Sequence, residues 1–136
     1  MISDLELKKT FEVFIDENDI LRGAVLKEIK EPADDDRRLE LLEESVLNIL
    51  KKNPEKSYKT FLNFLPLGKS RISISSGSRK AWGRLARQKQ IKKCAVVGSS
   101  IFLKTVANFI ISLAGRSEDI KWFFNEEEAL KWLEEE

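Results

Sequence analysis

Residues 91–115 constrain the fold more than any other stretch of this 136-residue chain. An uninterrupted apolar run, 94–97, ends at Gly98, which favours a strand covered on both faces, as in a parallel sheet between helices. Gly98 and Ser100 then predict a tight turn and a serine N-cap. A long apolar helix follows and stops at Gly115. This strand-turn-helix unit predicts an α/β fold.

The remaining sequence places further strands and helices around that unit. Strands are predicted at 11–15, 20–29, 58–65 and 120–124, and helices at 32–53, from Ser75 onward, and after Asn125. The expected architecture is a mixed five-stranded sheet with the first strand antiparallel and four helices. We expect one domain over 11–136, with 1–10 as a flexible or edge segment.

The residue types present exclude several kinds of chemistry. The chain has no histidine, which removes histidine bases and histidine metal ligands, and it has one cysteine, so no intramolecular disulfide can form. Cys94 opens the predicted buried strand and is interpreted as a core residue. No cluster of metal ligands or paired apolar carboxylates is evident, so we expect neither an enzyme nor a bound cofactor or metal.

Charge is strongly segregated along the chain although the net charge is only +1. Residues 56–117 contain 13 basic residues and no acidic one, and the segments on either side are acidic. Within this middle, 69–93 forms a basic band. Its bases either pair with the acidic helices before and after it or meet an anionic partner. Nucleic acid is not favoured, because Trp82 is the only aromatic side chain in the band available for base stacking.

The helix expected at 100–114 is more apolar than one core-facing stripe requires. It is either wedged between the sheet and other helices or forms a dimer face or a lipid-contacting surface. At 1.5 Å per residue it is too short to cross a hydrocarbon core of about 30 Å. We therefore expect a cytoplasmic protein, free or peripheral to the membrane, with a possible homodimer contact through this helix.

The order of elements resembles that of STAS domains, the fold of the SpoIIAA-like anti-sigma-factor antagonists. The likeness is closest over the strand Cys-Ala-Val-Val-Gly-Ser-Ser, the apolar helix after it, and the ending 122–133. In that family a serine at the N-terminus of the second helix is phosphorylated by a partner kinase within the motif Asp-Ser-Ser-Gly. Here Ile74-Ser75-Ser76-Gly77 stands at the matching place, with isoleucine instead of aspartate.

By position, the resemblance makes Ser76 the phosphoacceptor, with Ser75 as the alternative. The competing interpretation is that these serines only cap the helix. A phosphate would lie at a helix N-terminus, one turn from basic side chains. The residues expected to bind an anion or a partner are Ser78, Arg79, Lys80, Arg84, Arg87, Lys92 and Lys93.

Two functions follow as expectations. The first is a non-enzymatic regulatory module that binds a protein partner, a kinase or anti-sigma-like protein, through the N-terminus of the second helix. The alternative is a binder of an anionic lipid, a hydrophobic ligand or another polyanion, through the basic band and the apolar third helix, since some STAS-like domains are similar in fold to lipid-transfer modules.

Overall fold

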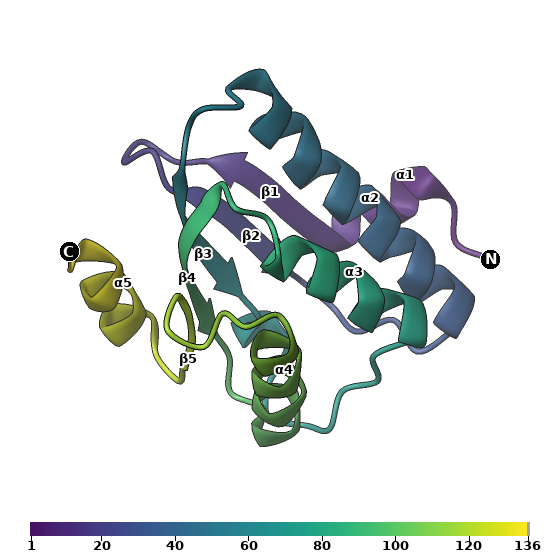
Figure 1. The fold of residues 1–136 in the computed structure, drawn as a ribbon. Helices are drawn as coiled ribbons and strands as arrows, with labels where there is room; N and C mark the ends of the chain where they lie inside the picture. The colour runs from purple at the N-terminus through teal and green to yellow at the C-terminus, as the bar shows by residue number, and fades with distance from the viewer. Residues whose placement is uncertain (136) are drawn as a thin grey trace.

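The computed structural model describes residues 1–135 and forms a five-stranded sheet with helices on both faces (Figure 1). The strands are β1 (Phe11–Ile15), β2 (Leu21–Val25), β3 (Tyr58–Asn63), β4 (Ile91–Val97) and β5 (Ile120–Phe123). The helices are α1 (Asp4–Leu7), α2 (Pro32–Lys52), α3 (Ser76–Ala86), α4 (Ile101–Leu113) and α5 (Glu126–Glu134), with 3₁₀ turns η1 (Lys8–Thr10) and η2 (Leu65–Leu67).

The sheet has the strand order β1-β2-β3-β4-β5. β1 pairs antiparallel with β2, and every later pair is parallel, which confirms the mixed sheet with an antiparallel first strand. Helices α2, α3 and α4 lie on one face, and α5 covers β3, β4 and β5 on the other (Figure 1). The predicted strand at 20–29 is shorter in the structure and ends at Val25.

The helix termini follow the capping residues expected from the sequence. The side chains of Ser75, Ser100 and Asn125 each accept a hydrogen bond from a backbone N–H three residues later, at the start of α3, α4 and α5. Gly115 has φ +68° just after α4, a conformation that favours glycine. Gly98 lies at the turn before α4, where an added Cβ would be 2.7 Å from Trp122 Cη2.

The expectation of four helices is wrong, because residues 1–135 contain five α-helices. The additional helix, α1, is four residues long, and so short an element shows no helical periodicity in the sequence. Ser3 caps it, and the backbone N–H of Ile2 donates to Asp34 Oδ1 at 3.1 Å. The segment 1–10, expected to be flexible or at an edge, therefore packs against α2, and Leu7 is fully buried.

The sheet separates two groups of buried side chains. The larger group lies between the sheet and α2, α3 and α4, and the smaller lies under α5 around Phe61, Ala95 and Val97. Helix α4 contributes only two buried residues, Leu103 and Ile111. Within residues 1–135, no helix combines the length and the apolar character that crossing a bilayer requires.

Candidate functional site

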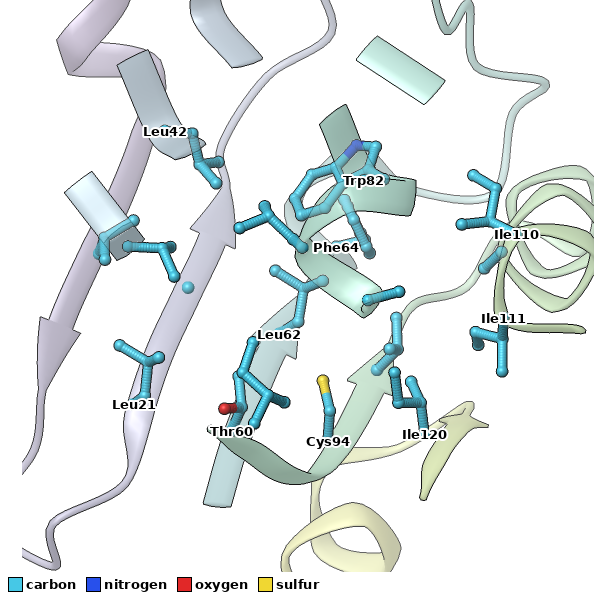
Figure 2. A pocket seen from close by; sticks show the side chains of 18 of the residues that line it. Leu21, Leu42, Thr60, Leu62, Phe64, Trp82, Cys94, Ile110, Ile111 and Ile120 are labelled. Carbon is cyan, nitrogen blue, oxygen red and sulfur yellow. The ribbon is translucent and has the colours of Figure 1, made fainter. Parts of the chain in front are cut away.

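An apolar cavity that is partly open to solvent lies between the sheet and helices α2, α3 and α4, within the larger group of core side chains (Figure 2). Its volume is about 110 Å³. Side chains from all three helices and from the middle of the sheet line it, among them Leu21, Leu42, Leu62, Trp82, Cys94 and Ile110. Alternation along the parallel strands turns Leu62, Cys94 and Val96 toward this face, whereas Ala95 and Val97 face α5.

The cavity has few polar groups. The hydroxyl of Thr60 is buried, and within residues 1–135 its Oγ1 has no hydrogen-bond partner. Cys94 lies beside it on the neighbouring strand, where burial raises the pKa of the thiol to about 12 despite the opposing effect of Arg116. The thiol therefore stays neutral at physiological pH and is a poor nucleophile, in agreement with its interpretation as a core residue.

Helix α4 forms one wall of the cavity and also carries apolar side chains on its outer surface. Leu103, Val106, Ala107, Ile110 and Ile111 line the cavity. Ile101, Phe109 and Leu113 are 72%, 65% and 64% exposed. The apolar excess of this helix is therefore divided between the cavity and an outer ridge, and we call Ile101, Phe109 and Leu113 the α4 ridge.

Cations lie next to the aromatic side chains around α4. Lys104 Nζ is 5.0 Å from the centre of the Phe124 ring, and the guanidinium of Arg71 is 4.5 Å from that of Phe102. Phe124 is itself 48% exposed. The α4 ridge is thus flanked by basic and aromatic side chains.

The N-terminus of α3 is occupied by carboxylates of the chain itself. The Ser75 hydroxyl donates to Asp36 Oδ1 at 2.5 Å, and the Ser75 backbone N–H donates to Asp35 Oδ2 at 2.9 Å. An added Cβ on Gly77 would lie 2.4 Å from Asp36 Oδ1, so glycine permits this close approach. Two aspartates from the start of α2 thus lie against the N-terminus of α3, where the helix dipole favours negative charge.

The three serines of this turn differ in accessibility. Ser78 is buried, Ser75 is partly buried and bonded to Asp36, and Ser76 is exposed. Arg79 and Lys80, also exposed, follow in the next turn. Ser76 is therefore the serine of the turn that remains open to solvent.

The bases expected to bind an anion do not form one surface. Arg79, Lys80 and Arg84 lie on α3 and Arg87 follows at its C-terminal cap. Arg84 forms a salt bridge with Glu43 of α2 at 2.7 Å. Lys93 lies on the opposite face of the sheet, where its Nζ donates to the carbonyl oxygens of Trp132 and Glu135 at the end of α5. Lys92 is exposed at the start of β4. Part of the band is therefore bound internally to α2 and α5.

Sequence reasoning missed the cavity and the aspartate cluster. In the sequence, Asp35 and Asp36 at the start of a helix indicate only N-terminal capping. In the structure, the Asp35 carboxylate is buried, with its Oδ1 3.1 Å from Arg38 Nη2. One sign of the cavity is visible in the sequence. The polar residue Thr60 interrupts the apolar positions of β3 that face the larger core. Ile74, which replaces the aspartate of the STAS motif, lines the cavity.

The fold is similar to that of a solved structure from Shewanella loihica PV-4, an uncharacterized protein from the DUF3478 family with a SpoIIAA-like fold. The TM-score is 0.57 and the sequence identity 16%, over 90% of this chain and 91% of that one. The chain thus has the SpoIIAA-like fold that its resemblance to STAS domains implied. A search of curated proteins finds no match. Because a family model matches residues 38–136, the chain belongs to the family described as "Domain of unknown function (DUF7793)".

Proposed function

We propose that this protein is a non-catalytic binding module that holds a small apolar ligand in the cavity beneath α4. The observation that carries this proposal is the cavity of about 110 Å³ with an almost wholly apolar lining. A void of this kind deprives its lining of dispersion contacts, and a ligand restores them. An engineered apolar cavity of about 150 Å³ stays dry and binds benzene. The present cavity, at about 110 Å³, is smaller, so a single aromatic ring is near the largest ligand that it can hold.

The lining also supports binding rather than chemistry. Cys94 is neutral because burial raises its pKa to about 12. Arg22 is paired with Asp16 at 2.8 Å. These are the titratable residues of the lining, and neither offers an activated nucleophile or a free base.

The proposal is tested by titrating the protein with toluene and following backbone amide chemical shifts. We expect saturable shifts in residues that line the cavity, and an accompanying rise in the unfolding temperature. Ala107→Leu adds methylene groups inside the cavity and should abolish both effects. Ala33→Leu adds the same groups on the exposed start of α2 and should preserve them. Wild-type protein without saturable shifts would refute the proposal.

A second candidate function is docking of the α4 ridge onto an anionic lipid surface. It is favoured by the exposed apolar side chains of the ridge beside Lys104 and Arg71, in a region without acidic residues. Flotation with vesicles containing phosphatidylglycerol should recover the protein, and phosphatidylcholine vesicles or high salt should not. Phe109→Ser should weaken recovery, whereas Phe14→Ser on β1, at a comparably exposed phenylalanine, should not.

The regulatory role implied by the STAS resemblance is a further proposal, in which a protein partner binds the N-terminus of α3 and Ser76 acts as the switch. Exposure of Ser76, Arg79 and Lys80 supports it, and the carboxylate of Asp36 beside Gly77 opposes an added phosphate. Ser76→Asp should change the affinity of a captured partner while Ser76→Ala does not. Equal affinities for the two variants would count against the switch.

A further inference from the structure

The hydroxyl of Thr60 is a polar group on the floor of an otherwise apolar cavity. Thr60 is 8% exposed, and its Oγ1 has no hydrogen-bond partner within residues 1–135. Figure 2 shows it between Leu21 and Cys94, its neighbours on the flanking strands. Leaving a buried hydroxyl unpaired is unfavourable, so such a group in a native protein calls for a physical explanation.

A lone water molecule is a poor explanation. A buried water is held by two to four polar partners, and the side chains flanking Thr60 on the sheet offer only a leucine and a neutral thiol. The hydroxyl has both a donor and two acceptor positions free for a ligand.

We propose that the natural ligand carries one neutral oxygen, a hydroxyl or a carbonyl, that hydrogen bonds Thr60 Oγ1 while its apolar body fills the cavity. This inference rests on the proposed function and specifies the class of ligand. The volume of about 110 Å³ limits the ligand to a single ring or a short chain. A charged head group is disfavoured at this position because a buried charge needs a partner. Phenol is the simplest compound that meets both requirements.

The test compares phenol with toluene, which has a methyl group in place of the hydroxyl, in wild-type protein and in Thr60→Val. The substitution removes the hydroxyl with little change in shape. We expect Thr60→Val to weaken phenol binding about fivefold, which is the loss of affinity that removing one hydrogen bond of ordinary net strength produces. Toluene binding should stay unchanged or become tighter. Thr60→Ser, which keeps the hydroxyl, should retain the affinity for phenol.

Thr10→Val is the matched control, because Thr10 is also buried but its hydroxyl already donates to the carbonyl of Leu7 at 2.6 Å. It should change neither affinity. If Thr60→Val weakens both ligands equally, or neither, the oxygen-binding role of Thr60 is refuted while the cavity remains a binding site. If wild-type protein binds neither ligand, the proposed function fails, and this inference fails with it.

Discussion

Gly77 is the residue where the shape of the α3 N-terminus is most tightly restricted. Its missing side chain leaves room for Asp36, whose Oδ1 would be 2.4 Å from an added Cβ and which also accepts the hydrogen bond from Ser75. Any larger residue must displace the Asp36 carboxylate and so weaken the hydrogen bond that it accepts from Ser75. Gly83 in the same helix differs, since an added Cβ would meet only the end of the Arg87 side chain, at 3.1 Å.

We therefore predict opposite effects of alanine at these two glycines. Gly77→Ala should lower the free energy of unfolding by about 1 kcal/mol, because displacing Asp36 outweighs the gain in helix propensity. Gly83→Ala should raise it by about 0.5–1 kcal/mol, since alanine favours a helix interior. Urea denaturation of both variants measures the difference. Equal stabilisation would mean that Asp36 moves at no cost.

Leu7 shows how much the short N-terminal helix contributes. It is fully buried, whereas Leu5, two residues earlier, is 71% exposed. We predict that Leu7→Ala lowers the free energy of unfolding by about 2–5 kcal/mol through the cavity that it leaves. Leu5→Ala should have almost no effect in the same denaturation experiment. A small effect of both changes would indicate that α1 does not pack stably against α2.

At the scale of elements, a buried ion pair joins α2 to the turn before α3. Asp35 and Arg38 have side chains only 3% and 5% exposed, and the Asp35 carboxylate also accepts the backbone N–H of Ser75. Arg38 in turn donates to the carbonyl of Lys27, and burial lowers the pKa of its guanidinium. The pair thus fixes three segments of the chain against one another.

Breaking this pair should be costly, because it leaves a buried charge without its partner. We predict that Asp35→Asn lowers the free energy of unfolding by about 3 kcal/mol or more. Asp4→Asn, which breaks the exposed pair between Asp4 and Arg37, should change the free energy of unfolding far less, because solvent screens an exposed pair. Thermal and urea denaturation would check both. Similar costs for the two variants would contradict a structural role for Asp35.

The turn between β1 and β2 depends on an ionised aspartate. Burial by itself would raise the pKa of Asp16, but hydrogen bonds from the backbone of Ile20, from Arg22 and from the backbone of Asn18 outweigh it and lower the pKa below 3.8. A carboxyl whose pKa is lower in the folded state stabilises the fold above its unfolded pKa, and this contribution is lost as the pH falls through the folded value.

Asp16→Asn should therefore flatten the pH dependence of stability at its acid end. The amide oxygen can still accept the backbone hydrogen bonds, but it no longer titrates or pairs with Arg22. Denaturation of both proteins between pH 6 and pH 2 measures the free energy of unfolding. This free energy should fall less steeply with decreasing pH in the variant than in the wild-type protein. Parallel curves would indicate that Asp16 does not contribute to the acid sensitivity.

Across the whole molecule, the helices differ in how firmly they are attached to the sheet. α2 buries eight residues over its length, including Leu39, Leu42 and Leu50, whereas α4 buries two. Because α4 also forms a wall of the cavity, it is the element through which a ligand could enter with the least loss of packing. In Figure 1 it stands at the end of the helical layer, beside β5.

We predict that the backbone amides of α4 exchange with solvent faster than those of α2. Saturating toluene or phenol should slow exchange in α4, because the ligand supplies the contacts that the empty cavity lacks. Hydrogen-exchange mass spectrometry measures both effects. Equal protection of the two helices in the free protein would place the entry route elsewhere.

The sequence by itself determined the order of the strands and helices from β1 onward, the mixed sheet, and the start of α3, α4 and α5 at capping residues. These features follow from local rules: the apolar run of β4, the helical spacing in α2, and the residues Ser75, Ser100 and Asn125 act within a few positions of one another. The role of Cys94 as a core residue also follows from its place in that apolar run.

Only the tertiary structure decided where the bases and the apolar surface of α4 lie and what they meet. Lys93 and Arg84, nine positions apart, end on opposite faces of the sheet, and Asp36 reaches Ser75 from 39 positions away. The cavity likewise forms where side chains of α2, α3, α4 and the sheet meet, and Thr60 on its β3 side has no hydrogen-bond partner within residues 1–135. Such features depend on how separate elements pack in space, and spacing along the chain carries no measure of packing.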